Sequence, residues 1–176
     1  ILAESFQLRY VQSSIVYRGL AFICMQENVD VHNQTKIIKL SASRDVISEV
    51  QGVDLNLEKI GDFASKISTI PEVRNNLGEY LKKIIKTTPR IIMEGRDIGT
   101  IIAPDADLKI FITANVNVRA KRRFKQLRDE GKDCILSDVL KLLKSRDERD
   151  TMRTLAPLKA ADKALVIDTS CLNPAE

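Results

Sequence analysis

The sequence predicts an α/β fold built on a parallel sheet, and three observations carry that prediction. Residues 91–93, 108–112 and 164–168 are short apolar runs typical of buried strands. Helical patterns separate these runs along the chain, as parallel pairing requires. The chain has 176 residues, enough for one domain with a substantial core and too few for two of ordinary size. We therefore expect a single domain.

The amino-terminal region is predicted to form a helix end, a strand and a buried helix. Residues 1–6 have the pattern of the last turns of a helix, and residues 8–11 that of a strand. The apolar segment 15–25 follows two serines, which are favourable N-cap residues, and Asn28 lies where a helix C-terminus is expected. Its one charge, Arg18, either meets an anionic partner or lies at the helix edge, because an unpaired buried charge is costly.

The region from 31 to 57 carries the weakest signal, and we interpret it as an insert. Residues 35–40 fit a short helix. Residues 46–50 and 53–57 fit the two strands of a hairpin that turns at Gln51-Gly52.

A long amphipathic helix is predicted next. A clear structural pattern resumes at residues 63–67, and Pro71 is well placed as the first residue of a helix. Apolar residues then recur at spacings of three and four, and Thr88-Pro89 ends the pattern. This helix leads into the strand at 91–93.

An abrupt change of polarity follows that strand, at Glu94-Gly95-Arg96-Asp97. The carboxyl ends of parallel strands form the ligand crevice of open α/β sheets, so this turn is a candidate site. The alternative is a turn with a surface ion pair.

Basic residues gather on the helix that follows the strand at 108–112. Asn115 can cap this helix and Gly131 can end it. Arg119, Arg122 and Arg123 are predicted to share one face, which favours either a phosphate site or an ordinary solvated face.

The next helix becomes charged along its apolar stripe. We expect Ser137 to cap it and Pro157 to stop it. The stripe consists of Val139, Leu142 and Leu143. Helical spacing along the same face then brings Arg146, Asp150 and Arg153, which predicts an anion-binding cleft beside the core. The alternative is a set of helix ion pairs, each worth only about 0.3–0.5 kcal/mol.

Composition narrows the function classes. The net charge is +4, but 28 basic and 24 acidic residues are interleaved and aromatic residues are few, which argues against nucleic-acid binding. The three cysteines lack metal-site spacing and are expected to be free thiols of a cytoplasmic protein. No apolar run approaches the roughly 20 residues of a membrane helix. The sequence has a single histidine, so neither histidine-based catalysis nor a zinc site is expected.

Many arginines with few other catalytic residue types favour phosphoryl transfer.

The sequence resembles bacterial cytidylate kinases, which are P-loop nucleoside monophosphate kinases, over nearly its whole length from Ser13 onward. The motifs that carry the resemblance are residues 94–100 (EGRDIGT), 104–111 (PDADLKIF), 146–150 (RDERD) with Arg153, 156–158 (APL), 161–162 (AD) and 166–168 (VID). It implies a three-layer fold with a parallel central sheet over a single kinase domain 1–176. It also implies a nucleoside-monophosphate-binding insert at 33–74 and a mobile lid at 120–132.

The resemblance also implies an activity and a set of site residues. The activity is transfer of the γ-phosphate of Mg-ATP to CMP and dCMP by a monomeric enzyme. Substrate binding is assigned to Ser13 at the base, Arg18 at the phosphate, Ser65 and Arg74 in the same pocket, Arg96 and Asp97 beside phosphate and cytosine, Arg146 and Asp150 at the ribose, and Arg153 at the base edge. Catalysis is assigned to Arg18, Arg96, Arg119, Arg123 and Arg146.

One family motif has no match here. The Walker A loop, G-x-x-x-x-G-K-[ST], does not occur in these 176 residues, so we expect the chain as given to lack the first strand and its ATP-phosphate cradle. Two alternatives remain open. A kinase for another monophosphate, such as UMP, would differ at Ser13, Arg74 or Asp97. A non-catalytic nucleotide- or RNA-binding domain would have no phosphate cradle at all.

Overall fold

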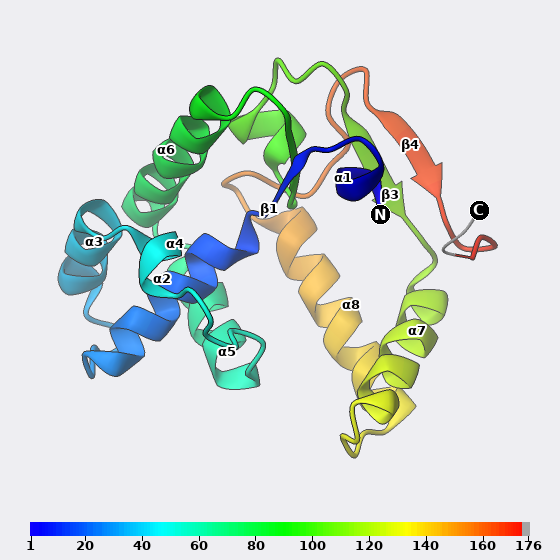
Figure 1. Ribbon diagram of the computed structural model, residues 1–176. Helices are drawn as coiled ribbons and strands as arrows, with labels where there is room; N and C mark the ends of the chain where they lie inside the picture. The colour runs from blue at the N-terminus through cyan, green and yellow to red at the C-terminus, as the bar shows by residue number, and fades with distance from the viewer. Residues whose placement is uncertain (174–176) are drawn as a thin grey trace. The chain divides into compact units, whose positions relative to one another are not determined.

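The computed structural model describes residues 1–173 and divides into two compact units, Ile1–Gly95 and Arg96–Glu176 (Figure 1). The described strands form two separate two-stranded parallel sheets, β1 with β2 in the first unit and β3 with β4 in the second. The predicted mixed α/β class with parallel strands is therefore confirmed. Within the described residues, no helix is both long enough and apolar enough to span a membrane. A single kinase domain over residues 1–176 remains a prediction.

The first unit begins as predicted, with a short helix, a strand and a buried helix. These are α1 (Leu2–Ser5), β1 (Arg9–Gln12) and α2 (Ser14–Gln26). β1 pairs in parallel with β2 (Ile91–Glu94), so that Gln12 lies opposite Glu94. β2 was expected to be buried, but its apolar residues are only half-buried, and β1 is its one partner among the described strands.

Helix α2 supplies the centre of the first unit's core. Val16, Leu20 and Cys24 recur every four residues and are fully buried, because residues at that spacing share one helix face. Asn28 follows the helix end with φ of 51°, a left-handed conformation that asparagine tolerates well. The chain can therefore turn at the predicted point.

The predicted hairpin at 46–57 is wrong. Residues Val46–Glu49 form a short helix, α4, and residues 53–57 have no regular structure. Asp45 starts the helix by accepting a hydrogen bond from the Ser48 amide, and Val46 and Val50 are both buried. Those two valines are four residues apart and therefore point to one side of a helical turn. The turn at Gly52 is confirmed by its φ of 76°.

The remaining helices of the first unit agree with the sequence pattern. They are α3 (Gln34–Ser43), α5 (Glu58–Ile67) and α6 (Pro71–Thr87). Pro71 is the first residue of α6 and Thr88 is its C-cap, as predicted. α5 packs on α2, and α3 packs on α6.

A glycine allows the close packing of α2 against α4. A Cβ built at Gly19 would lie 2.5 Å from Val46 Cγ1, which is closer than real Cβ contacts. We expect Gly19→Ala to reduce the free energy of unfolding by about 1–2 kcal/mol, because overpacking outweighs the better helix propensity of alanine.

Urea denaturation measures this effect, and Gly61→Ala is the matched control. A Cβ at Gly61 would meet only the Arg18 guanidinium, at 3.6 Å, so that variant should be neutral or slightly stabilised. Equal stability of the two variants would contradict the packing argument.

The strands of the second unit lie where the sequence predicts, but they are not buried. β3 (Ile110–Thr113) and β4 (Leu165–Asp168) pair in parallel, with Ile112 opposite Ile167. Ile112 is 68% exposed and Leu165 is 56% exposed. Apolar composition predicted strand formation correctly, whereas burial depends on what covers the two faces of the sheet.

Two helices run side by side in the second unit, α7 (Val116–Asp129) and α8 (Leu136–Met152) (Figure 1). Asn115 caps α7 by accepting a hydrogen bond from the Asn117 amide, and Gly131 has a φ of 72° just after its end, as predicted. α8 begins one residue before the predicted cap. Of its predicted apolar stripe, Val139 is buried and Leu142 is 66% exposed.

Candidate active site

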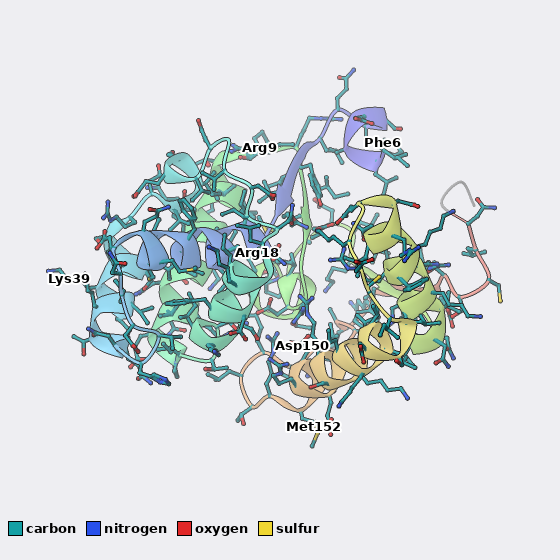
Figure 2. The ribbon with its side chains drawn as sticks, turned by 90° about the horizontal axis from the view of Figure 1, so that it is seen from below. Phe6, Arg9, Arg18, Lys39, Asp150 and Met152 are labelled. Carbon is teal, nitrogen blue, oxygen red and sulfur yellow. The ribbon has the colours of Figure 1, made fainter. Side chains whose placement is uncertain are left out.

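The carboxyl end of α8 carries a cluster of ionic groups within the second unit. Asp150, only 9% exposed, forms an ion pair with Arg96. Asp150 Oδ1 also lies 3.9 Å from Arg153 Nη1. Figure 2 labels Asp150 beside Met152, at the end of this helix. The structure thus brings together three predicted substrate-binding residues, Arg96, Asp150 and Arg153.

The electrostatics of Arg96 involve a fourth predicted residue, Arg146, which is exposed. Burial lowers the pKa of Arg96 from its ordinary value, and repulsion from Arg146 lowers it further. Asp150 and Asp147 act in the opposite direction. Arg96 and Arg146 are therefore close enough to repel, and such a pair of cations is stabilised by a bound anion.

The end of α8 fixes the position of Arg153. The helix ends at Met152, earlier than the predicted stop at Pro157, and Arg153 is an extended C-cap residue. Its Nε donates to the Ala156 carbonyl at 2.6 Å, and the Leu158 amide donates to the Asp150 carbonyl at 2.8 Å. These two bonds hold the chain against the last turn of α8 and keep Arg153 beside Asp150.

The three arginines of α7 do not converge on one site. Arg119 forms an ion pair with Asp147 of α8. Arg122 donates to the carbonyls of Thr169 and Leu172, at 2.6 and 2.9 Å. Arg123 donates to Gln126 at 2.8 Å. The three residues stand at positions i, i+3 and i+4 of α7 and therefore share one helix face, as predicted, but each guanidinium meets a different partner.

Arg18 finds a partner in a loop of the first unit (Figure 2 labels it on α2). Its Nη1 donates to the Leu55 carbonyl at 2.7 Å and lies 3.4 Å from Asn56 Oδ1. Of the two alternatives for this charge, an anionic partner or the helix edge, the structure supports neither fully. Arg18 is half-buried, and the oxygens that accept its hydrogen bonds, from Leu55 and Asn56, are both neutral.

Arg74, on α6, is oriented by an aromatic ring. Its guanidinium carbon lies 5.8 Å from the centroid of the Tyr17 ring, within the range of a cation–π interaction. Its Nη1 also donates to the Ser68 carbonyl at 3.2 Å. The first unit therefore holds this cation by its planar face and by one edge.

The remaining predicted residues lie at the ends of elements. Ser13 is buried just before α2, and its amide donates to the Glu94 carbonyl at 2.9 Å. Ser65 is in the last turns of α5. Asp97 directly precedes the π-helix Ile98–Ile102, and its carbonyl accepts from the Ile101 amide at 2.9 Å. Glu94 accepts from Gln12 at 2.6 Å.

Sequence reasoning missed Tyr17, Asn56 and Asp147 as partners of the predicted arginines. Tyr17 directly precedes Arg18 and Asp147 directly follows Arg146, so adjacency was the one available signal. Nothing in the sequence indicated Asn56, because the loop that carries it was expected to be a strand.

Comparisons with known proteins identify the family of this chain. The profile of the family described as cytidylate kinase matches residues 1–176. The chain is 55% identical over 176 residues to a cytidylate kinase of Rickettsia akari, and 56% identical over 174 residues to one of Rickettsia bellii. These alignments cover 100% and 99% of this chain and 79% of each relative. The chain belongs to the cytidylate kinase family.

Proposed function

We propose that the protein transfers the γ-phosphoryl group of ATP to CMP and dCMP, giving CDP and dCDP. The observation that carries the proposal is the cluster around Asp150, where Arg96 and Arg153 meet one buried carboxylate and Arg146 lies near Arg96. The cations of this cluster outnumber its acids, so it is suited to bind the phosphate of a nucleotide.

The second unit would bind the phosphate, the sugar and one edge of the base. We assign Arg96 and Arg146 to the α-phosphate, because their mutual repulsion is relieved by an anion between them. Asp150 would accept a hydrogen bond from the ribose, while Arg146 supports the sugar. Asp97 and Arg153 would contact the cytosine.

The first unit would contribute four further contacts to CMP. Arg18 would exchange its two neutral oxygen partners for the phosphate, because a charge-assisted bond to an anion is stronger than a bond to a carbonyl. Ser13, Ser65 and Arg74 would contact the base. The cation–π contact with Tyr17 orients Arg74 before the nucleotide arrives.

Base selection follows from hydrogen-bond polarity. Cytosine presents acceptors at O2 and N3 and a donor at N4, whereas uracil has a donor at N3 and an acceptor at O4. An arginine facing the acceptors and an aspartate or serine facing the amine are left with buried, unpaired groups when uracil is bound. This mismatch is a strong form of discrimination.

The chemistry demands positioning and charge neutralisation. The attacking oxygen of CMP and the leaving oxygen of ADP must lie in line with the transferred phosphoryl group, whose charge is spread over its equatorial oxygens. Arg18, Arg96 and Arg146 would hold the acceptor phosphate, and Arg123 would approach the transferred group. Mg²⁺ enters with ATP, because in kinases it is bound largely through substrate phosphates and water.

The finer architecture also belongs to this proposal. We assign residues 33–74 to the nucleoside-monophosphate-binding insert and residues 120–132 to a lid that closes over ATP, on a three-layer fold with one central sheet. The lid segment begins within α7, where Arg123 is exposed, which is compatible with a contact made only on closure. We expect a monomer that works in the cytoplasm.

A steady-state panel of monophosphates tests the function. With Mg-ATP and the full-length protein, kcat/KM for CMP and dCMP should exceed that for UMP by about a hundredfold or more. AMP and GMP should be poorer still, because a purine does not fit a pyrimidine site. Equal efficiency with CMP and UMP would refute the assignment of the base contacts.

A further inference from the structure

The side chain of Arg119 is held between two helices of the second unit. Nη1 and Nη2 donate to the two carboxylate oxygens of Asp147, at 3.0 and 2.6 Å, and Nε donates to the Ala114 carbonyl at 2.9 Å. This is a bidentate fork with a third bond at its base, the geometry in which arginine binds a carboxylate most strongly. The two bonds to Asp147 fix the start of α7 to the last third of α8, and the bond to Ala114 holds the Arg119 side chain against the residue before the α7 cap.

The carboxylate that Arg119 holds belongs to the neighbourhood of the cationic cluster. Asp147 directly follows Arg146 in α8 and lies one helical turn before Asp150. Its negative charge raises the pKa of the Arg96 guanidinium, whereas burial and Arg146 lower that pKa. Asp147 is therefore within electrostatic reach of the groups that we assign to the phosphate.

We propose that Arg119 is a positioning residue that holds the Asp147 carboxylate away from Arg96 and Arg146, so that both cations remain available to the nucleotide phosphate. This role rests on the proposed function. It replaces the direct catalytic role that the resemblance assigned to Arg119, because the guanidinium already binds the carboxylate of Asp147.

The physical reason is competition between anions. A carboxylate on α8 that loses its partner rotates toward the nearest cations, and an intramolecular anion has a high effective concentration there. Arg96 and Arg146 would then be neutralised by Asp147, and the phosphate would have to displace it. Loss of Arg119 should weaken CMP binding without removing any group that touches CMP.

Three variants of the full-length protein test this role. Arg119→Met removes the fork and keeps apolar bulk, Asp147→Asn removes the competing charge, and the third variant combines both changes. We expect Arg119→Met to raise KM for CMP about tenfold while kcat changes by less than about threefold. Asp147→Asn alone should leave KM within about threefold of wild type. The double variant should return to the same range, because it has no carboxylate to compete.

A direct phosphate contact predicts the reverse for the double variant, which would then be no better than Arg119→Met. That result would overturn the proposal, as would an unchanged KM in Arg119→Met. Lys141→Met, which removes an exposed cation from α8, controls for net charge. The monophosphate panel on the wild type tests the proposed function separately. The kinetics of the variants are measured with the monophosphate that the wild type uses best. A wrong substrate assignment therefore shows in the wild-type panel, and a wrong role for Arg119 shows in the variants.

Discussion

Replacing Arg153 by methionine is expected to lower kcat/KM for CMP by about a hundredfold or more, equivalent to roughly 3 kcal/mol of transition-state stabilisation. Methionine keeps the apolar bulk of the side chain and removes the charge and the donors. Arg153 is 22% exposed and lies beside the buried Asp150, in the cluster that we assign to the nucleotide. Loss of Arg153 should therefore lower catalytic efficiency more than it lowers the stability of the free protein.

The stability of Arg153→Met should change much less than its activity. The variant loses the bond from Nε to the Ala156 carbonyl, and one such bond contributes about 1 kcal/mol. For a chain of this size that is a fall in Tm of roughly 2–4 °C. Scanning calorimetry and steady-state kinetics on the same preparation provide both values.

Lys144→Met is the matched control for this substitution. Lys144 is an exposed cation on the same helix, so its loss should leave both Tm and kcat/KM near the wild-type values. A destabilised but fully active Arg153→Met would show that Arg153 serves the helix end alone.

Replacing Asp150 by alanine should damage both stability and catalysis. Asp150 lies between Arg96 and Arg153, and its removal leaves two partly buried cations without their shared carboxylate. Breaking a buried pair costs about 3–5 kcal/mol; we expect about 2–4 kcal/mol here, because Arg96 is 34% exposed. Urea denaturation measures this loss.

The kinetic part of the prediction separates sugar binding from structural support. If Asp150 accepts a hydrogen bond from the ribose 2′-hydroxyl, kcat/KM for CMP should fall several-fold more than kcat/KM for dCMP. The deoxy substrate has no such group to lose. Glu148→Ala, which removes an exposed carboxylate from the same helix, should leave the CMP to dCMP ratio unchanged. An identical loss with both substrates in Asp150→Ala would exclude the ribose contact.

The sequence by itself determined most of the regular elements, the hairpin at 46–57 excepted, and the residues of the cluster. Pro71, Thr88, Asn115 and Gly131 mark helix ends by rules that act over one turn of backbone, and the structure follows them. The charged continuation of the α8 stripe correctly predicted that Asp150 faces inward, because helical spacing relates residues along one face, but Arg146 on the same stripe is exposed and Arg153 follows the helix end.

Only the tertiary structure decided which charges meet and which faces are covered. Arg119 and Asp147 are 28 positions apart, and nothing local in either segment says that a bidentate fork joins them. Residues 46–50 suit a strand or a helical turn equally, and packing against Gly19 of α2 decided for the helix. The physical reason is the separation along the sequence over which each kind of interaction acts. Capping and periodicity depend on near neighbours, whereas ion pairs and burial depend on groups that folding brings together from distant parts of the chain.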